Sequence, residues 1–90
     1  MPQDYIKSLI ESDKLEQALS AVDSSIADNV APAATYHFLR GKILWRLGRR
    51  SEARREYATA VELDPTSPAR VALELATEIE DFFNPDIYNP

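Results

Sequence analysis

The sequence contains no cysteine and only one histidine, and these shortages exclude several kinds of chemistry. Without cysteine the chain has no disulfide, no thiol nucleophile and no cysteine-ligated zinc. His37 lacks a second histidine that would help it to bind zinc, and no nucleophile or orienting carboxylate accompanies it in a motif. We therefore interpret His37 as structural and expect no cofactor, no metal site and no enzymatic activity.

Long apolar runs and glycine-rich segments are absent as well. No stretch approaches the roughly 18 apolar residues that a membrane span requires, and no phosphate-binding glycine loop occurs. The first residues, MPQDYIKSLIESDK, lack the basic and apolar regions of a secretory signal. We expect a cytoplasmic protein that does not bind membranes.

The composition suits one small globular domain, because the chain has 90 residues of which 44% are hydrophobic. Its net charge of −5 opposes general binding to nucleic acid. The charge is uneven, since residues 40–55 hold seven bases and one acid while the segments on either side are acidic. The arginines of this stretch predict either an anion-binding patch or, as we favour, a solvated edge neutralised by Glu52 and Glu56. They include Arg46, Arg49, Arg50, Arg54 and Arg55.

Apolar residues recur at helical spacing along most of the chain. No segment alternates apolar and polar residues in the way that a strand would, and no Asn-Gly or Asp-Gly hairpin turn occurs. Because the segments between the helical patterns are short, neighbouring helices should pack antiparallel. We predict five helices, at residues 4–12, 15–28, 33–47, 51–64 and 68–83.

Several residues mark where these helices begin and end. Gly48 is placed to end the third helix as a C-cap glycine. Ser51 is predicted to N-cap the fourth helix, which Pro65 ends. Ser67 followed by Pro68 predicts the N-cap and the first position of the fifth helix.

Gly41 lies within the third predicted helix, where glycine costs about 1 kcal/mol relative to alanine. Such a cost suggests a packing reason, because small residues allow two helices to approach closely. The fourth helix also has small residues, Ala53 and Ala60, with Tyr57 between them. We predict a helical hairpin in which Gly41 faces these two alanines and the tyrosine ring.

These features together resemble the tetratricopeptide repeat, a helical hairpin with a period of about 34 residues. The resemblance is strongest from Ala34 to Ser67. This unit departs from the family at two positions: the large aromatic position falls at His37, with Tyr36 and Phe38 beside it, and the leucine position falls at Arg40, with Leu39 one step earlier. Six residues match the packing positions of the repeat: Gly41, Gly48, Ala53, Tyr57, Ala60 and Pro65.

The resemblance is weaker on both sides of this unit, and it implies an all-α fold of antiparallel helical hairpins in one domain, residues 1–90. Residues 3–33 resemble a degenerate hairpin in which Ala18 corresponds to Ala53 and Ser25 to Ala60. Residues 34–67 form the complete unit. Residues 68–83 resemble the capping helix that ends such arrays, and residues 84–90 are a tail.

The resemblance also implies a non-catalytic module that binds a protein or peptide on the concave face formed by the first helix of each hairpin. Aromatic and cationic side chains in that concavity would suit an acidic or carboxylate-ended peptide. Alternatively, the aromatic residues of this set only pack against neighbouring helices. The residues that the resemblance places in the groove include Lys7, Phe38, Lys42, Trp45, Arg46 and Ile79.

A second function, structural self-association, is possible through the capping helix or the tail. The last nine residues, FFNPDIYNP, contain four large apolar side chains, and an exposed end of this kind would be adhesive. We expect an ordered tail, which either folds back on the chain or docks on a second copy or a partner. Neither nucleic acid nor membrane is expected as a partner.

Overall fold

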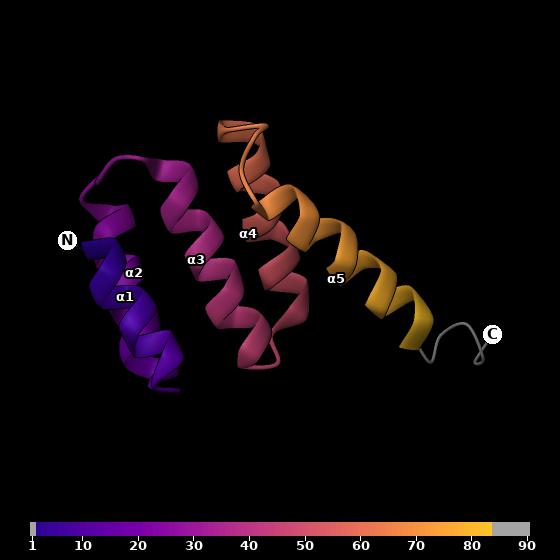
Figure 1. Ribbon diagram of the computed structural model, residues 1–90, viewed down its shortest axis with the longest axis horizontal. Coiled ribbons are helices and arrows are strands. Elements are labelled where there is room, and N and C mark those ends of the chain that lie inside the picture. Colours follow the sequence, from indigo (N-terminus) through magenta and orange to yellow (C-terminus); the bar gives the residue numbers. More distant parts are fainter. Residues whose placement is uncertain (1, 84–90) are drawn as a thin grey trace.

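The computed structural model describes residues 2–83, and Figure 1 shows their arrangement. Each predicted helix is present, with ends within two residues of the predicted ones, and no strand occurs in the described part of the chain. The all-α fold expected from the sequence is therefore confirmed. The helices are α1 (Pro2–Glu11), α2 (Leu15–Ala27), α3 (Ala33–Arg46), α4 (Arg50–Leu63) and α5 (Ala69–Phe83).

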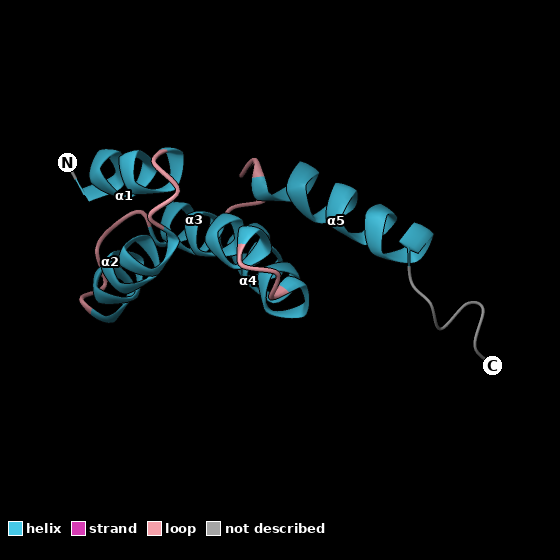
Figure 2. Cartoon of the chain, turned by 90° about the horizontal axis from the view of Figure 1, so that it is seen from below, coloured by secondary structure: helices cyan, strands magenta, loops and turns pink. Residues whose placement is uncertain are grey.

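The helices form two layers. Figure 2 shows α1, α3 and α5 on one side and α2 and α4 on the other. Packing follows the order of the chain, since each helix contacts its neighbours in sequence, and α1 also contacts α3. The molecule measures 46 × 28 × 19 Å, so it is elongated along the direction in which the helices stack.

The first three helices end in the same way, with one residue in the left-handed region. These residues are Asp13, Asn29 and Gly48, with φ angles of 61°, 55° and 85°. In each turn the amide after this residue donates to a carbonyl five residues earlier, which is the Schellman arrangement. The three bonds run from Lys14 N to Leu9 O (2.8 Å), from Val30 N to Ser25 O (3.0 Å) and from Arg49 N to Leu44 O (2.9 Å).

The two predicted serine caps have different outcomes. The prediction for Ser51 is wrong, because α4 begins at Arg50 and Arg49 holds the N-cap position without a side-chain hydrogen bond to the helix. The prediction for Ser67 is confirmed, because its Oγ accepts a hydrogen bond of 3.1 Å from the Ala69 amide. The turn after Gly48 is closed by backbone hydrogen bonds, and α4 starts two residues earlier than an N-cap at Ser51 would allow.

The core consists of two hydrophobic clusters that meet at α3. One joins α1, α2 and α3, and the other joins α3, α4 and α5. The buried residues of the first are Ile6, Leu9, Ile10, Ala18, Val22, Tyr36, Leu39 and Ile43. Those of the second are Leu44, Ala53, Tyr57, Ala60, Ala69 and Ala76.

Gly41 faces the ring of Tyr57, as the sequence predicts. A Cβ atom on Gly41 would lie 2.5 Å from Cε1 and 2.6 Å from Cδ1 of that ring, so no larger residue fits. Ala53 and Ala60 lie one turn to either side of Tyr57 and are fully buried. Burial raises the pKa of the Tyr57 hydroxyl to about 12.

The buried face of α3 differs from the one that the repeat pattern predicts. Tyr36 and Leu39 are each 1% exposed, whereas His37 and Arg40 are only partly buried. The aromatic and leucine positions of the repeat are thus filled one residue earlier than predicted. This shift turns His37 and Arg40 towards the acidic residues of α2 and α4.

The C-terminal part of the chain extends away from the other helices. In Figure 1, α5 diverges from α4 as it runs towards its C-terminal end. The predicted ordering of the tail concerns residues 84–90, which lie outside the described residues. Within residues 2–83, no helix has the length and apolar character needed to cross a membrane.

Candidate functional site

Phe38 and Lys42 lie one turn apart on α3, in the layer that also contains α1 and α5 (Figure 2). Phe38 is half-buried, with its ring centroid 6.0 Å from that of Tyr57, so packing fixes its orientation. The Lys42 side chain is exposed and its Nζ lies 5.5 Å from the Phe38 ring centroid. The pair thus forms a cation on an aromatic face, open to solvent on one side.

A pocket of about 220 Å³ adjoins Phe38 and brings three parts of the chain together. Gln3 and Lys7 of α1 stand on one side, and the turn between α4 and α5 stands on the other. The α3 and turn residues that complete the lining are Ala34, Thr35, Phe38, Leu39, Asp64, Ser67 and Pro68. The lining combines apolar side chains with a few polar groups, the mixture that binding pockets usually have.

Asp64 brings a negative charge to the edge of this pocket, but its carboxylate is already engaged. Oδ1 accepts hydrogen bonds from the Thr66 amide (3.0 Å) and the Thr66 hydroxyl (2.7 Å). These two bonds lower the pKa of the Asp64 carboxyl, with the hydroxyl as the larger cause. Asp64 therefore holds the turn, and an incoming acidic group would be drawn to the lysine side of the pocket.

Three arginines have carboxylate partners, whereas the lysines of this face have none among the described residues. Arg40 bonds Asp23 at 2.7 Å and lies 3.5 Å from Glu56. Further pairs join Arg49 to Glu52 (2.7 Å) and Arg70 to Glu74 (3.9 Å). Among the described residues neither Lys7 nor Lys42 has a carboxylate partner. In a chain of net charge −5, these two positive charges remain available to a ligand.

Trp45 and Arg46, also predicted in the groove, make structural contacts. Trp45 packs against the cluster shared by α3, α4 and α5, and the Arg50 guanidinium lies 4.6 Å from its ring centroid. Arg46 Nη1 donates a hydrogen bond of 2.8 Å to the Ile10 carbonyl, in the last turn of α1. Ile79 lies in α5, and its side chain is outside the described part of the structure.

The structure thus brings Lys7, Phe38 and Lys42 together and gives Trp45 and Arg46 other contacts. The arginine cluster is engaged at three of its members, since Arg46, Arg49 and Arg50 contact a carbonyl, a carboxylate and a ring. Of the two acids expected to neutralise this edge, Glu52 pairs with Arg49, whereas Glu56 contacts His37 and Arg40.

A polar network that joins α3 to α2 and α4 was not predicted. His37 Nδ1 lies 2.9 Å from Glu56 Oε1, and Arg40 connects Glu56 to Asp23 of α2. The sequence offers one signal for it, because His37 and Arg40 are three residues apart on a helix and so share a face. Which acidic residues they meet depends on how α2 and α4 pack around α3, and the spacing of residues in the sequence does not reveal that packing.

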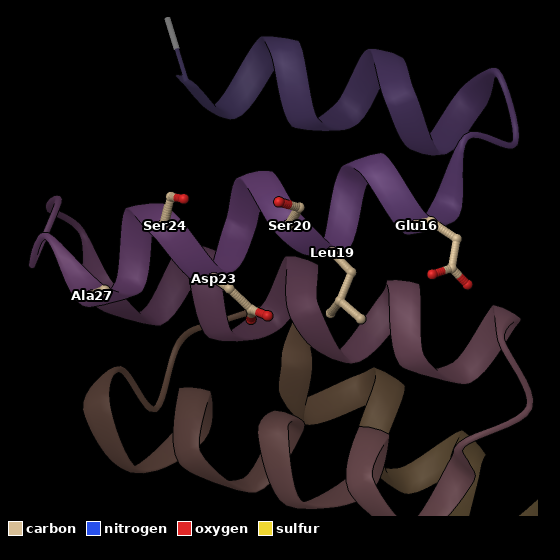
Figure 3. Close-up of a pocket in the computed structure, with 6 residues that line it drawn as sticks. All are labelled: Glu16, Leu19, Ser20, Asp23, Ser24 and Ala27. Carbon is tan, nitrogen blue, oxygen red and sulfur yellow. The ribbon is translucent and has the colours of Figure 1, made fainter.

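A depression runs along α2 beside this network, and Figure 3 shows its lining. Leu19 and Asp23 project towards α3, while Ser20 and Ser24 point away. All of its lining residues belong to α2, so no second element encloses it: they are Glu16, Leu19, Ser20, Asp23, Ser24 and Ala27. Across residues 2–83, no three acidic or histidine side chains gather as metal ligands would.

Comparison with known proteins places this geometry in a family. The sequence profile described as "Tetratricopeptide repeat" matches residues 34–67. The solution NMR structure of the Bacteroides fragilis protein BF1650 is similar over 97% of this chain and 88% of that chain, with a TM-score of 0.86 and 32% sequence identity. The chain belongs to the tetratricopeptide repeat family. No curated protein gives a significant match.

The matched segment of this tetratricopeptide repeat protein contains α3, α4 and the turns that follow them. It therefore includes Phe38 and Lys42 but not Lys7, which comes from α1. The pocket beside Phe38 is consequently formed by the repeat together with α1 and with Pro68, which directly precedes α5.

Proposed function

We propose that this protein binds an acidic peptide segment of a partner protein on the face formed by Lys7, Phe38 and Lys42. Tetratricopeptide repeats generally serve as protein-interaction modules without catalytic activity. The observation that supports this particular face is the presence of two lysines without carboxylate partners among the described residues, beside a half-buried aromatic ring.

The pocket suggests how such a segment would lie. An aliphatic side chain of the peptide would enter between Phe38, Leu39 and Pro68, which supply the apolar lining. A glutamate, an aspartate or the terminal carboxylate would then reach Lys7 or Lys42. Asp64 stands on the turn side of the pocket and favours this direction over the reverse one.

The test is a titration with an eight-residue peptide of alternating leucine and glutamate, followed through the NMR signals of Phe38 and its neighbours. The matched peptide has glutamine in place of glutamate. Because an exposed ion pair contributes up to about 1 kcal/mol, the change Lys7→Glu with Lys42→Glu should weaken binding roughly 25-fold or more. Added salt should weaken the binding of the glutamate peptide selectively.

Lys14→Glu provides the control, since Lys14 is also an exposed lysine but does not line the pocket. It should leave the affinity nearly unchanged. Equal binding of the glutamate and glutamine peptides would disprove the proposal. Signal changes confined to Asp23 and Arg40, where α3 meets α2, would also disprove it.

A further inference from the structure

The apolar residues of α5 are distributed in an unexpected way. Among residues 69–78, the part of α5 whose side chains the structure describes, the covered apolar residues are small or only partly buried, namely Ala69, Ala72, Leu73 and Ala76. Val71 and Leu75 point outward, with 58% and 53% of their surface exposed. A helix that closes an array should have the opposite pattern, with its large apolar residues inside and polar residues outside.

Val71 and Leu75 form a continuous patch because they are one turn apart on the same face of the helix. Large exposed hydrophobic residues are few in the described structure, and the other two, Tyr5 and Leu63, lie on other helices. The outer face of α5 thus has an apolar strip at Val71 and Leu75.

Among the five described helices, none covers this strip. Helix α3 packs between α2 and α4, whereas the main contact of α5 is with α4 alone. Figures 1 and 2 both show α5 as the last element, directed away from the other helices. Along the array each helix is covered by the next one, as α4 covers α3. The outer side of α5 is the equivalent surface, so a helix is the element that would fit there.

The charge beside the strip indicates what kind of helix would fit. Glu74 and Glu78 are exposed next to Leu75, and α5 as a whole contains four acids and one base. The base, Arg70, lies 3.9 Å from Glu74, which is a weak contact between exposed groups. The flank of the strip is thus acidic, opposite in sign to the lysines near Phe38.

We propose that the outer face of α5 docks one helix of a partner protein, which has apolar residues at i, i+4 spacing and lysine or arginine beside them. This interface is separate from the proposed peptide site, because it uses different residues and attracts the opposite charge. A second copy of the chain is a poorer fit. In a two-fold antiparallel pair of α5 helices, Glu74 and Glu78 would lie near their own equivalents.

The experiment uses the full chain and an 18-residue helical peptide with leucine on one face and lysine on both flanks. The matched peptide has glutamate in place of lysine. Binding is followed by calorimetry and by the methyl NMR signals of Val71 and Leu75, and sedimentation of the protein alone gives its mass. Two double variants are compared, Val71→Ser with Leu75→Ser and Glu74→Lys with Glu78→Lys. All four positions are exposed, so the fold should persist, and circular dichroism checks this.

The expected result is one-to-one binding of the lysine peptide, weakened at least tenfold by the serine variant. The variant Glu74→Lys with Glu78→Lys should instead bind the glutamate peptide more tightly than the lysine peptide. Tyr5→Ser, which removes an equally exposed apolar residue from α1, should change nothing. The proposal would be overturned if the lysine peptide failed to bind or if the serine variant bound it as tightly as the unchanged protein. It would also be overturned if the peptide shifted the NMR signals of Phe38 and left those of Leu75 unchanged. A protein that is dimeric alone and monomeric as the serine variant would show that a second copy covers the strip.

Discussion

Gly41 and Gly48 are needed for different physical reasons. Gly41 is helical and buried, and it leaves space for the ring of Tyr57. Gly48 has a φ of 85° in a turn, and a Cβ there would meet nothing within 4 Å. The first residue is thus required by packing and the second by backbone conformation.

Changing each glycine to alanine should separate these two causes. Gly41→Ala should lower the free energy of unfolding by about 1–3 kcal/mol because it overpacks the helix interface. Gly48→Ala should cost about 1–2 kcal/mol because alanine is strained at positive φ. Urea unfolding of both variants gives the two values.

Repeating both glycine changes in a protein that already carries Tyr57→Ala distinguishes the two causes, because the effect of Gly41→Ala on stability should change sign. Without the ring, Gly41→Ala should become neutral or stabilising, since alanine favours a helix over glycine by about 1 kcal/mol. The cost of Gly48→Ala should stay the same in that background. An unchanged cost of Gly41→Ala would show that the ring is not what excludes a side chain.

At the scale of helix pairs, the two hairpins achieve the same packing with different residues. Val22 and Ile6 lie 35 positions before Tyr57 and Gly41, respectively, and are equally well buried. The second hairpin pairs a large ring with no side chain, whereas the first has two aliphatic residues of middle size. The first hairpin therefore lacks the glycine of the repeat because it also lacks the ring.

This exchange of size can be tested with a double-mutant cycle. Ile6→Gly should be strongly destabilising because it opens a cavity, and Val22→Tyr should be destabilising by overpacking. Together they recreate the pair found in the second hairpin, so the double variant should recover at least about 1 kcal/mol relative to the sum of the single changes. The free energy of unfolding in urea measures this coupling. Strictly additive effects would mean that the two positions do not share one space.

The sequence predicts the helices and the Gly41–Tyr57 contact well, because apolar period and small residues act locally. For α3 it gives two answers, because the apolar period favours Tyr36 on the buried face whereas the alignment with the repeat favours His37. The structure buries Tyr36. The sequence also leaves open which part of the apolar face of α5 is covered. That face is broad enough that α4 covers only one side of it, and Val71 and Leu75 remain outside.

At the scale of the whole molecule, stability should vary along the array. Helices α3 and α4 form the most extensive pair, and α3 contributes to both clusters of the core. Helix α5 has one principal neighbour and an exposed outer face. Local opening requires less free energy where fewer contacts must break.

Amide hydrogen exchange should therefore be slowest around Ile43 and Leu44 and fastest in α5. We expect the amides of α1 and α2 to fall between these limits. Measurement of exchange by NMR at neutral pH, where both core and end helices can be followed, provides the comparison. Equal protection along all five helices would instead indicate that the array opens only as a single cooperative unit.

The order in which the helices pack also bears on how the chain is made. Each helix finds its main partner in the segment that directly precedes or follows it, across a turn of a few residues. Such contacts close short loops, whose entropy cost is small and whose formation is fast. The first hairpin can therefore begin to pack while the later helices are still being synthesised, and each new helix adds to a surface that is already there.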